Sequence, residues 1–190
     1  MKEAAHFTLF ATPRGTCAIA WRGGKICGSY LPEASRELTT SGMARRLGGA
    51  TEGVPPDFAT SAIADILELL SGAPNDLTAI ECDFAGIETF ALRVYRLSRA
   101  IKPGQTRTYG DIGVELGDRA YAQAVGRALG ANPFPIIVPC HRILGAGGKL
   151  TGFSAGGGVN TKLKLLEIEK AQIGSKPSLF ADLPLAVKAR

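Results

Sequence analysis

The segment from Asn132 to Arg142, NPFPIIVPCHR, constrains this chain more than any other. Three prolines interrupt a short apolar run, and each proline fixes its own φ and lacks a backbone N–H. We therefore expect an extended, poorly adaptable backbone that holds Cys140 and His141 in place before any ligand arrives. A nucleophilic cysteine is one interpretation of this segment, and a buried cysteine beside an incidental histidine is the other.

Nucleophilic chemistry at Cys140 would need help from neighbouring groups. A thiol with a reference pKa of about 8.5 is only about 3% thiolate at pH 7. His141 and Arg142 offer a base or a positive field, but adjacent side chains on an extended strand point apart. The dipeptide alone therefore does not establish a hydrogen bond between thiol and imidazole.

The first half of the chain has the pattern of a small α/β unit. Short apolar or β-branched segments are separated by turn residues such as Pro13 to Gly15 and Gly23-Gly24, which predicts an antiparallel meander. The predicted strands cover 7–12, 16–21, 25–31 and 78–84, and the predicted helices cover about 32–47 and 61–70. No catalytic cluster is visible there, so we interpret this half as a scaffold.

The second half differs in charge. Residues 1–85 contain 7 basic and 10 acidic side chains, whereas residues 86–190 contain 15 and 7. A basic half is either a solvated surface or a site for a polyanion such as nucleic acid. Because the composition shifts near Gly86, we predict a scaffold domain over 1–85, a second domain over 86–170 and a tail over 171–190.

The basic half has the outline of a helix-turn-helix. After an arginine-rich helix that ends near Lys102, a short helix over 111–116 is followed by Gly117 and by a longer helix from Asp118, its N-cap, to Leu129, with Gly130 as C-cap. The polar side chains on one face of the longer helix are Arg119, Gln123 and Arg127. The small residues between them suit close approach to a groove, and they suit helix packing almost equally.

The composition indicates the cellular compartment of the protein and the kinds of site that it lacks. The four cysteines lie far apart and form no C-x-x-C pair. The chain also has only two histidines, so a zinc site would need ligands from scattered positions. No apolar run approaches the roughly 20 residues that span a bilayer, and the start of the chain has no secretory pattern. We therefore expect a cytoplasmic protein with free thiols and with no disulfide framework, metal site or membrane contact.

Pro139 to Ile143 resembles the Pro-Cys-His-Arg-Val motif of the O6-alkylguanine-DNA alkyltransferases, or methylated-DNA-protein-cysteine methyltransferases. The likeness covers about residues 86–170. Ile101 to Gly110 is similar to the family's Ile-Pro-x-Gly-x-Thr-x-Ser/Thr-Tyr-Gly stretch, and Gly152 to Glu169 is similar to its glycine loop and closing helix. The resemblance implies an α/β N-terminal domain with a small antiparallel sheet and a mainly α, helix-turn-helix or winged-helix-like C-terminal domain.

The resemblance also implies direct reversal of DNA damage. The thiolate of Cys140 would accept the alkyl group of O6-alkylguanine, with O4-alkylthymine as a further substrate, in double-stranded DNA. Each molecule would act once, as a monomer and without a cofactor. By the same resemblance, His141 would deprotonate the thiol through a water, Glu169 would hold the histidine, and Asn132 would support the active-site turn.

A base inside a duplex has to be flipped out before the thiolate reaches it. The resemblance assigns nucleic-acid contacts to Thr108, Tyr109, Arg119, Gln123, Arg127 and Arg142, and the walls of the base pocket to Pro135, Phe153, Ser154 and Ala155. Gln123 departs from the pattern, because the family usually has there the arginine that fills the vacated stack. We therefore expect weaker or slower flipping.

Two other classes of function stay open. A non-catalytic helix-turn-helix module that binds DNA or senses alkylation would have Cys140 merely buried. A cysteine hydrolase would use Cys140 and His141 over many turnovers, and it would need an oxyanion hole that the sequence does not reveal.

Overall fold

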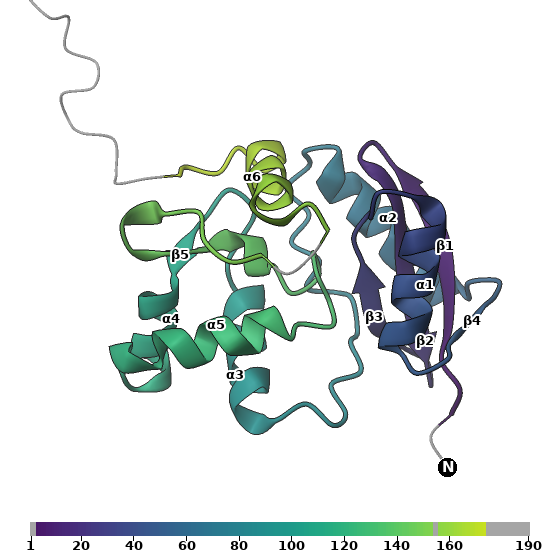
Figure 1. The fold of residues 1–190 in the computed structure, drawn as a ribbon, viewed down its shortest axis with the longest axis horizontal. Helices are drawn as coiled ribbons and strands as arrows, with labels where there is room; N and C mark the ends of the chain where they lie inside the picture. The colour runs from purple at the N-terminus through teal and green to yellow at the C-terminus, as the bar shows by residue number, and fades with distance from the viewer. Residues whose placement is uncertain (1–2, 154–155, 174–190) are drawn as a thin grey trace, which may run out of the picture.

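The computed structural model describes residues 3–153 and 156–173. The N-terminal half forms a four-stranded sheet of order β3-β2-β1-β4, which lies to one side of the molecule (Figure 1). Its strands are β1 (His6–Thr12), β2 (Gly15–Arg22), β3 (Lys25–Tyr30) and β4 (Thr51–Glu52). The first three strands form the predicted antiparallel meander, and β4 adds a short parallel pairing with β1 that makes the sheet mixed.

Two helices cover opposite faces of this sheet, α1 (Arg36–Arg46) and α2 (Asp57–Leu70). Alternate residues of β2 point to opposite faces. Ile19 therefore packs in one buried cluster with Ile66 of α2, whereas Ala18 packs in another with Met43 of α1. Both predicted helices are confirmed, although α1 begins only after Ser35, whose side chain caps it.

The predicted strand over 78–84 is wrong. Only Cys82 makes a bridge, to Ile26, and the segment has no ladder on either side of it. The guanidinium of Arg99 instead accounts for three carbonyls here, those of Leu77, Thr78 and Ile80, at 3.0, 2.9 and 3.0 Å. The start of the segment thus bonds a side chain of the C-terminal half, and its pairing with β3 is limited to two backbone bonds at Ile26, from its N–H to the Glu81 carbonyl and from the Asp83 N–H to its carbonyl.

The C-terminal half is mostly helical. Its elements are α3 (Thr89–Arg99), β5 (Arg107–Thr108), α4 (Tyr109–Leu116), the 3-10 turn η1 (Arg119–Tyr121), α5 (Ala122–Gly130), the 3-10 turn η2 (Cys140–Arg142), β6 (Ile143–Leu144), the turn η3 (Ala146–Gly148) and α6 (Gly158–Ile168). Strands β5 and β6 pair in parallel. This arrangement confirms the predicted fold class, an α/β N-terminal part followed by a mainly α part with a helix-turn-helix.

The helix-turn-helix differs from the prediction in one detail. Thr108 and Asp111 form a capping box at the start of α4, and Gly117 makes the turn with a φ of 122°. Asp118 caps η1 rather than a continuous helix, so α5 begins only at Ala122 and extends through Gly130. The predicted longer helix is therefore a 3-10 turn followed by an α-helix.

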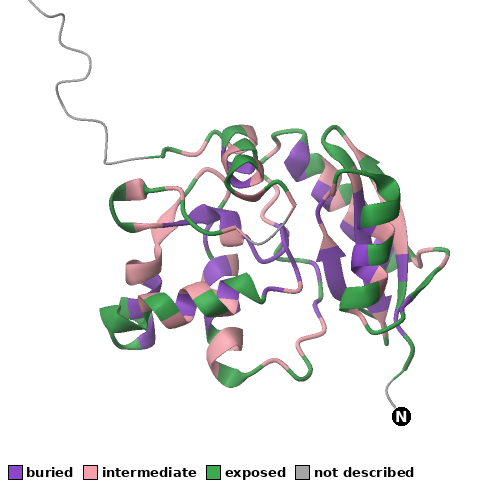
Figure 2. Cartoon of the chain, in the orientation of Figure 1, coloured by how far each residue is buried: buried purple, intermediate pink, exposed green. Residues whose placement is uncertain are grey.

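The two halves share a buried core. One cluster contains Ile19 and Ile66 together with Val125, Ile143 and Leu165. Figure 2 shows buried residues along the segments between the sheet and α5, and exposed residues on the outer face of α1 and on the turn before α5. The domain boundary near Gly86 stays a prediction. Among the described residues, no helix has the length and apolar character needed to cross a membrane.

Candidate active site

The proline-rich segment is a folded loop rather than the extended strand predicted from its sequence. Ile136 has a φ of 76°, and the N–H of Val138 donates to the carbonyl of Phe134 at 2.7 Å, so the chain turns back on itself. The side chain of Asn132 closes the turn: its amide donates to the Val138 carbonyl at 2.9 Å and its oxygen accepts from the Phe134 N–H at 2.9 Å. Prolines leave few N–H donors, and Asn132 supplies the missing bonds.

Cys140 and His141 follow this loop in the single turn η2. The Cys140 N–H donates to the Val138 carbonyl at 2.8 Å, which ties the turn to the loop before it. The alternation expected of an extended strand does not apply. Cys140 is partly exposed, whereas the side chain of His141 is completely buried.

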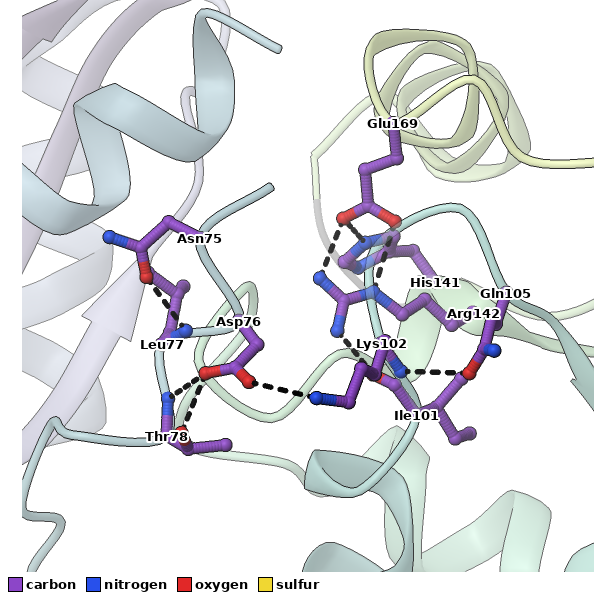
Figure 3. A network of polar contacts seen from close by, with 10 residues as sticks. All are labelled: Asn75, Asp76, Leu77, Thr78, Ile101, Lys102, Gln105, His141, Arg142 and Glu169. Carbon is purple, nitrogen blue, oxygen red and sulfur yellow. Dashed lines mark hydrogen bonds and ion pairs between the residues drawn. The ribbon is translucent and has the colours of Figure 1, made fainter. Parts of the chain in front are cut away.

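His141 is part of a buried network that includes Arg142 and Glu169 (Figure 3). Glu169, at the C-terminal end of α6, lies 2.8 Å from Nε2 of His141 and accepts from Nε and Nη2 of Arg142 at 2.9 and 2.8 Å. The Nη1 group of Arg142 donates to the Ile101 carbonyl at 2.6 Å. Two residues 28 positions apart, His141 and Glu169, are thereby held together.

The charges in this network fix the role of each nitrogen of His141. Burial opposes ionisation of Glu169, but hydrogen bonds from His141 and Arg142 lower the pKa of its carboxyl to about 2. Burial lowers the pKa of His141, with Glu169 opposing the shift, so the imidazole is neutral at pH 7. An ionised carboxylate accepts the proton of Nε2, so Nδ1 is the basic nitrogen. Within the described residues, Nδ1 is buried and has no hydrogen-bond partner.

Cys140 differs from the other cysteines in its surroundings. All four are free, and Cys17, Cys27 and Cys82 are buried. Burial raises the pKa of the Cys17 thiol to about 12 and that of Cys82 to about 11. Burial also raises the pKa of Cys140, but a hydrogen bond from Asn132 and the charge of Lys162 oppose the increase. Cys140 is thus the thiol with both access and groups that favour its ionised form.

Two cavities meet at Cys140. The smaller cavity, of about 270 Å³, is lined by Leu129, Pro135 and Phe153 and, from the N-terminal half, by Tyr30, Gly42, Arg45 and Arg46. The larger cavity, of about 970 Å³, is lined by Thr108, Tyr109, Arg119, Gln123 and Arg127, among others. A thiol at the junction of a small pocket and a wide basic pocket is accessible to a group that a large polyanion carries.

Comparison with known proteins identifies this arrangement. Residues 89–171 match the family model "6-O-methylguanine DNA methyltransferase, DNA binding domain". The methylated-DNA–protein-cysteine methyltransferase of Mycobacterium leprae is 49% identical over 92% of this chain and 98% of its own, and that of Mycobacterium tuberculosis is 35% identical over the same shares. The chain belongs to the O6-methylguanine DNA methyltransferase family.

Solved structures of this methyltransferase family agree in fold. The crystal structure of the Mycobacterium tuberculosis O6-methylguanine methyltransferase has a TM-score of 0.70 and 32% identity, covering 93% of this chain and 98% of that one. The complex of the same organism's protein with DNA has a TM-score of 0.68 and 36% identity, covering 87% and 92%.

For this family member, the predicted DNA-contacting residues divide into two groups. Arg119, Gln123 and Arg127 are exposed and line the larger cavity with Thr108 and Tyr109. Arg142 is 1% exposed and bound to Glu169, so the prediction that it contacts nucleic acid is wrong. The position of Arg142 beside Cys140 and His141 suggested a surface role, but its guanidinium binds the buried carboxylate of Glu169 instead.

The predicted pocket residues are placed in part. Pro135 and Phe153 line the smaller cavity. Ser154 and Ala155 lie outside the described residues.

Sequence reasoning missed the part that the N-terminal half of this methyltransferase plays in the site. Ser29 of β3 donates its N–H to the Pro133 carbonyl at 3.0 Å and its hydroxyl to the Pro135 carbonyl at 2.7 Å. Arg46 of α1 donates to the Asn132 carbonyl at 2.6 Å. This half is therefore more than a scaffold, because it holds the active-site loop. No local signal in the sequence pairs these segments.

Sequence reasoning also gave Lys162 no role. This residue of α6 is completely buried, and its ammonium donates to the carbonyls of Ile143 and Thr151. A signal for it did exist, since Lys162 shares helical spacing with the buried residues Leu165 and Leu166.

Proposed function

We infer that this protein is a methylated-DNA–protein-cysteine methyltransferase, which repairs DNA by moving an alkyl group to a cysteine of its own chain. The acceptor that we propose is Cys140. The observation that carries this assignment is the position of its thiol, where two cavities meet and the neutral His141, oriented by Glu169, lies next in the chain.

The proposed reaction is a single displacement. The thiol proton passes toward Nδ1 of His141, and the thiolate attacks the alkyl carbon on guanine O6. A sulfur–carbon bond forms as the carbon–O6 bond breaks, and the electron pair stays on the guanine. The guanine then takes up the proton from His141, which leaves ordinary guanine in the DNA and a thioether on Cys140. No step of this reaction regenerates the thiol, so each molecule acts once. The reaction needs no cofactor.

The protein binds DNA, as its match to the family's DNA-binding domain and the DNA complex of a relative indicate. The finer proposal is that it binds double-stranded DNA containing O6-alkylguanine, with O4-alkylthymine as a further substrate. The exposed face of Arg119, Gln123 and Arg127 supports this proposal, since it borders the larger cavity that leads to Cys140. Flipping the base costs a few kcal/mol, which these contacts have to offset.

We further propose that the protein works as a cytoplasmic monomer. The thiol, imidazole and carboxylate all come from one chain. Four free cysteines fit a reducing compartment.

Stoichiometry tests this proposal. A duplex with a labelled methyl group on one guanine O6 is added in increasing excess, and the label on the protein is counted. We expect the label to level off at one methyl per chain. Release of free methanol with continued turnover would indicate a hydrolase, and tight binding without transfer would indicate a non-catalytic DNA-binding module.

A further inference from the structure

Lys162 is a buried cation without the usual partner. Its side chain is completely buried in α6 and reaches across to the segment that follows the reactive turn. The ammonium donates to the carbonyls of Ile143 at 2.5 Å and Thr151 at 3.0 Å, and it lies 5.6 Å from the centre of the Tyr109 ring. All of these groups are neutral.

Buried lysines are ordinarily paired with a carboxylate, because an uncompensated charge in the interior is costly. Among the described residues, no ion pair joins Lys162 to an aspartate or glutamate. The nearby carboxylate, Glu169, is taken up by His141 and Arg142. The Tyr109 ring beneath the ammonium lines the same cavity as Cys140, and the charge of Lys162 acts on the Cys140 thiol. That thiol is the group that becomes anionic during the proposed reaction.

We propose that Lys162 is the counter-ion of the Cys140 thiolate, held in place by the carbonyls of Ile143 and Thr151. This inference rests on the proposed function, since it assigns the source of the positive field that the nucleophile needs. Lys162 acts through Cys140 and need not touch the DNA, so it is a positioning residue.

The electrostatics of the pair act in both directions. Burial lowers the pKa of Lys162 to about 8, and Cys140 opposes that shift. Lys162 in turn opposes the burial that raises the pKa of Cys140. The other titratable or charged groups around the pair are His141 and Arg142 of η2, Glu169 after α6, Tyr109 of α4, Tyr95 of α3 and Arg46 of α1. Lys162 and Arg46 are the cations among them that favour the thiolate directly.

The test is the pH dependence of Cys140 reactivity in Lys162→Met. The rate at which iodoacetamide alkylates Cys140 is measured by peptide mapping at each pH from 5 to 10. This readout does not depend on repair activity. We expect the apparent pKa of Cys140 to rise by about one unit or more. The rate at pH 7 should then fall about threefold to tenfold, since a more basic thiolate is also a better nucleophile.

Two variants serve as controls. Lys162→Arg keeps the charge and should retain an apparent Cys140 pKa close to that of the parent. Lys164→Met removes an exposed lysine from the same helix and should leave the profile unchanged. A Lys162→Met protein that is folded, as judged by its thermal melting, and has the parental Cys140 pKa would overturn the proposal and leave Lys162 a purely structural role.

A reciprocal measurement covers the case in which Lys162→Met does not fold. The pKa of the Lys162 amine is measured by NMR of labelled lysine in the parent and in Cys140→Ala. Coupled sites shift each other, so we expect the amine pKa to fall by about one unit when the thiol is removed. An unchanged amine pKa would contradict the pairing. If the pairing holds but no alkyl group is transferred from DNA, it is the proposed function that fails.

Discussion

At the scale of single residues, the chemistry depends on how Glu169 is shared. Its carboxylate, 2% exposed, accepts from a neutral imidazole and from a guanidinium at once. The guanidinium keeps the carboxylate ionised, and the carboxylate keeps the Nε2 proton of His141 in place. The basic nitrogen of His141 is thereby fixed as Nδ1 without a charge on the ring.

This arrangement predicts a pH-dependent contribution to stability. A carboxyl whose pKa falls on folding, here to about 2, stabilises the protein above its unfolded pKa and loses that contribution as pH falls. We expect Glu169→Gln to be less stable than the parent at pH 7, and the gap to narrow by about 2 kcal/mol between pH 6 and pH 3. Urea unfolding at both pH values measures it. Glu167→Gln, at an exposed position of the same helix, is the control, and parallel curves for Glu169→Gln and the parent would refute the prediction.

Gln123 carries a second residue-scale prediction. It is exposed on the face that borders the larger cavity, where the resemblance places a stack-filling arginine in other members. We expect Gln123→Arg to repair duplex DNA about fivefold faster relative to free O6-benzylguanine, because a guanidinium in the vacated stack returns about 1 kcal/mol. Equal ratios for mutant and parent would remove the idea.

At the scale of elements, the helix-turn-helix depends on a close backbone approach at Gly113. A Cβ there would lie 2.9 Å from the Asp118 carbonyl and 3.3 Å from the Ala122 nitrogen, which are backbone atoms that cannot easily move. We expect Gly113→Ala to lower the free energy of unfolding by about 1–3 kcal/mol and to weaken DNA binding. Thermal melting and a binding titration measure the two effects.

Gly130 provides the matched control for that substitution. Among the residues that the structure describes, no heavy atom lies within 4 Å of a Cβ placed at Gly130, and the φ of Gly130 is not positive. Gly130→Ala should therefore keep the parental melting temperature or raise it slightly. Similar losses in both variants would show that the close approach at Gly113 is not the cause.

Elements with a local signal were predictable from the sequence, and elements that depend on distant partners were not. The apolar spacing of 61–70 correctly predicted α2, and Gly117 correctly predicted the turn before η1. The segment 78–84 has strand-like residues, but Arg99 bonds the carbonyls of Thr78 and Ile80, and the segment forms only one bridge, at Cys82. The proline-rich loop turns at Ile136 because Asn132 bonds across it, and proline content alone does not reveal that.

At the scale of the whole molecule, the N-terminal half supports the active-site loop. The carbonyls of Asn132, Pro133 and Pro135 accept from Arg46 and Ser29, which belong to the first half of the chain. Loop prolines remove donors that the segment would otherwise use for itself. The sequence likeness that identified His141 and Glu169 contained no information on this docking.

Ser29 tests that support. Its hydroxyl bond to Pro135 is buried, so Ser29→Ala leaves a buried carbonyl without that donor. We expect a loss of about 1–3 kcal/mol in the free energy of unfolding and slower alkyl transfer in the protein that remains folded. Ser41→Ala, at an exposed position of α1, should change neither. An active-site rate unaffected by Ser29→Ala would mean that the N-terminal half does not position the loop.

The most direct test of the whole account is the mass of the chain after reaction. The protein is incubated with a duplex that contains one O6-methylguanine, and the intact chain and its peptides are then weighed. We predict one added methyl group on Cys140, none on Cys17, Cys27 or Cys82, and none anywhere in Cys140→Ala. A methyl group on another residue, or an unmodified chain after it has bound that duplex, would contradict the assignment of Cys140 as the alkyl acceptor.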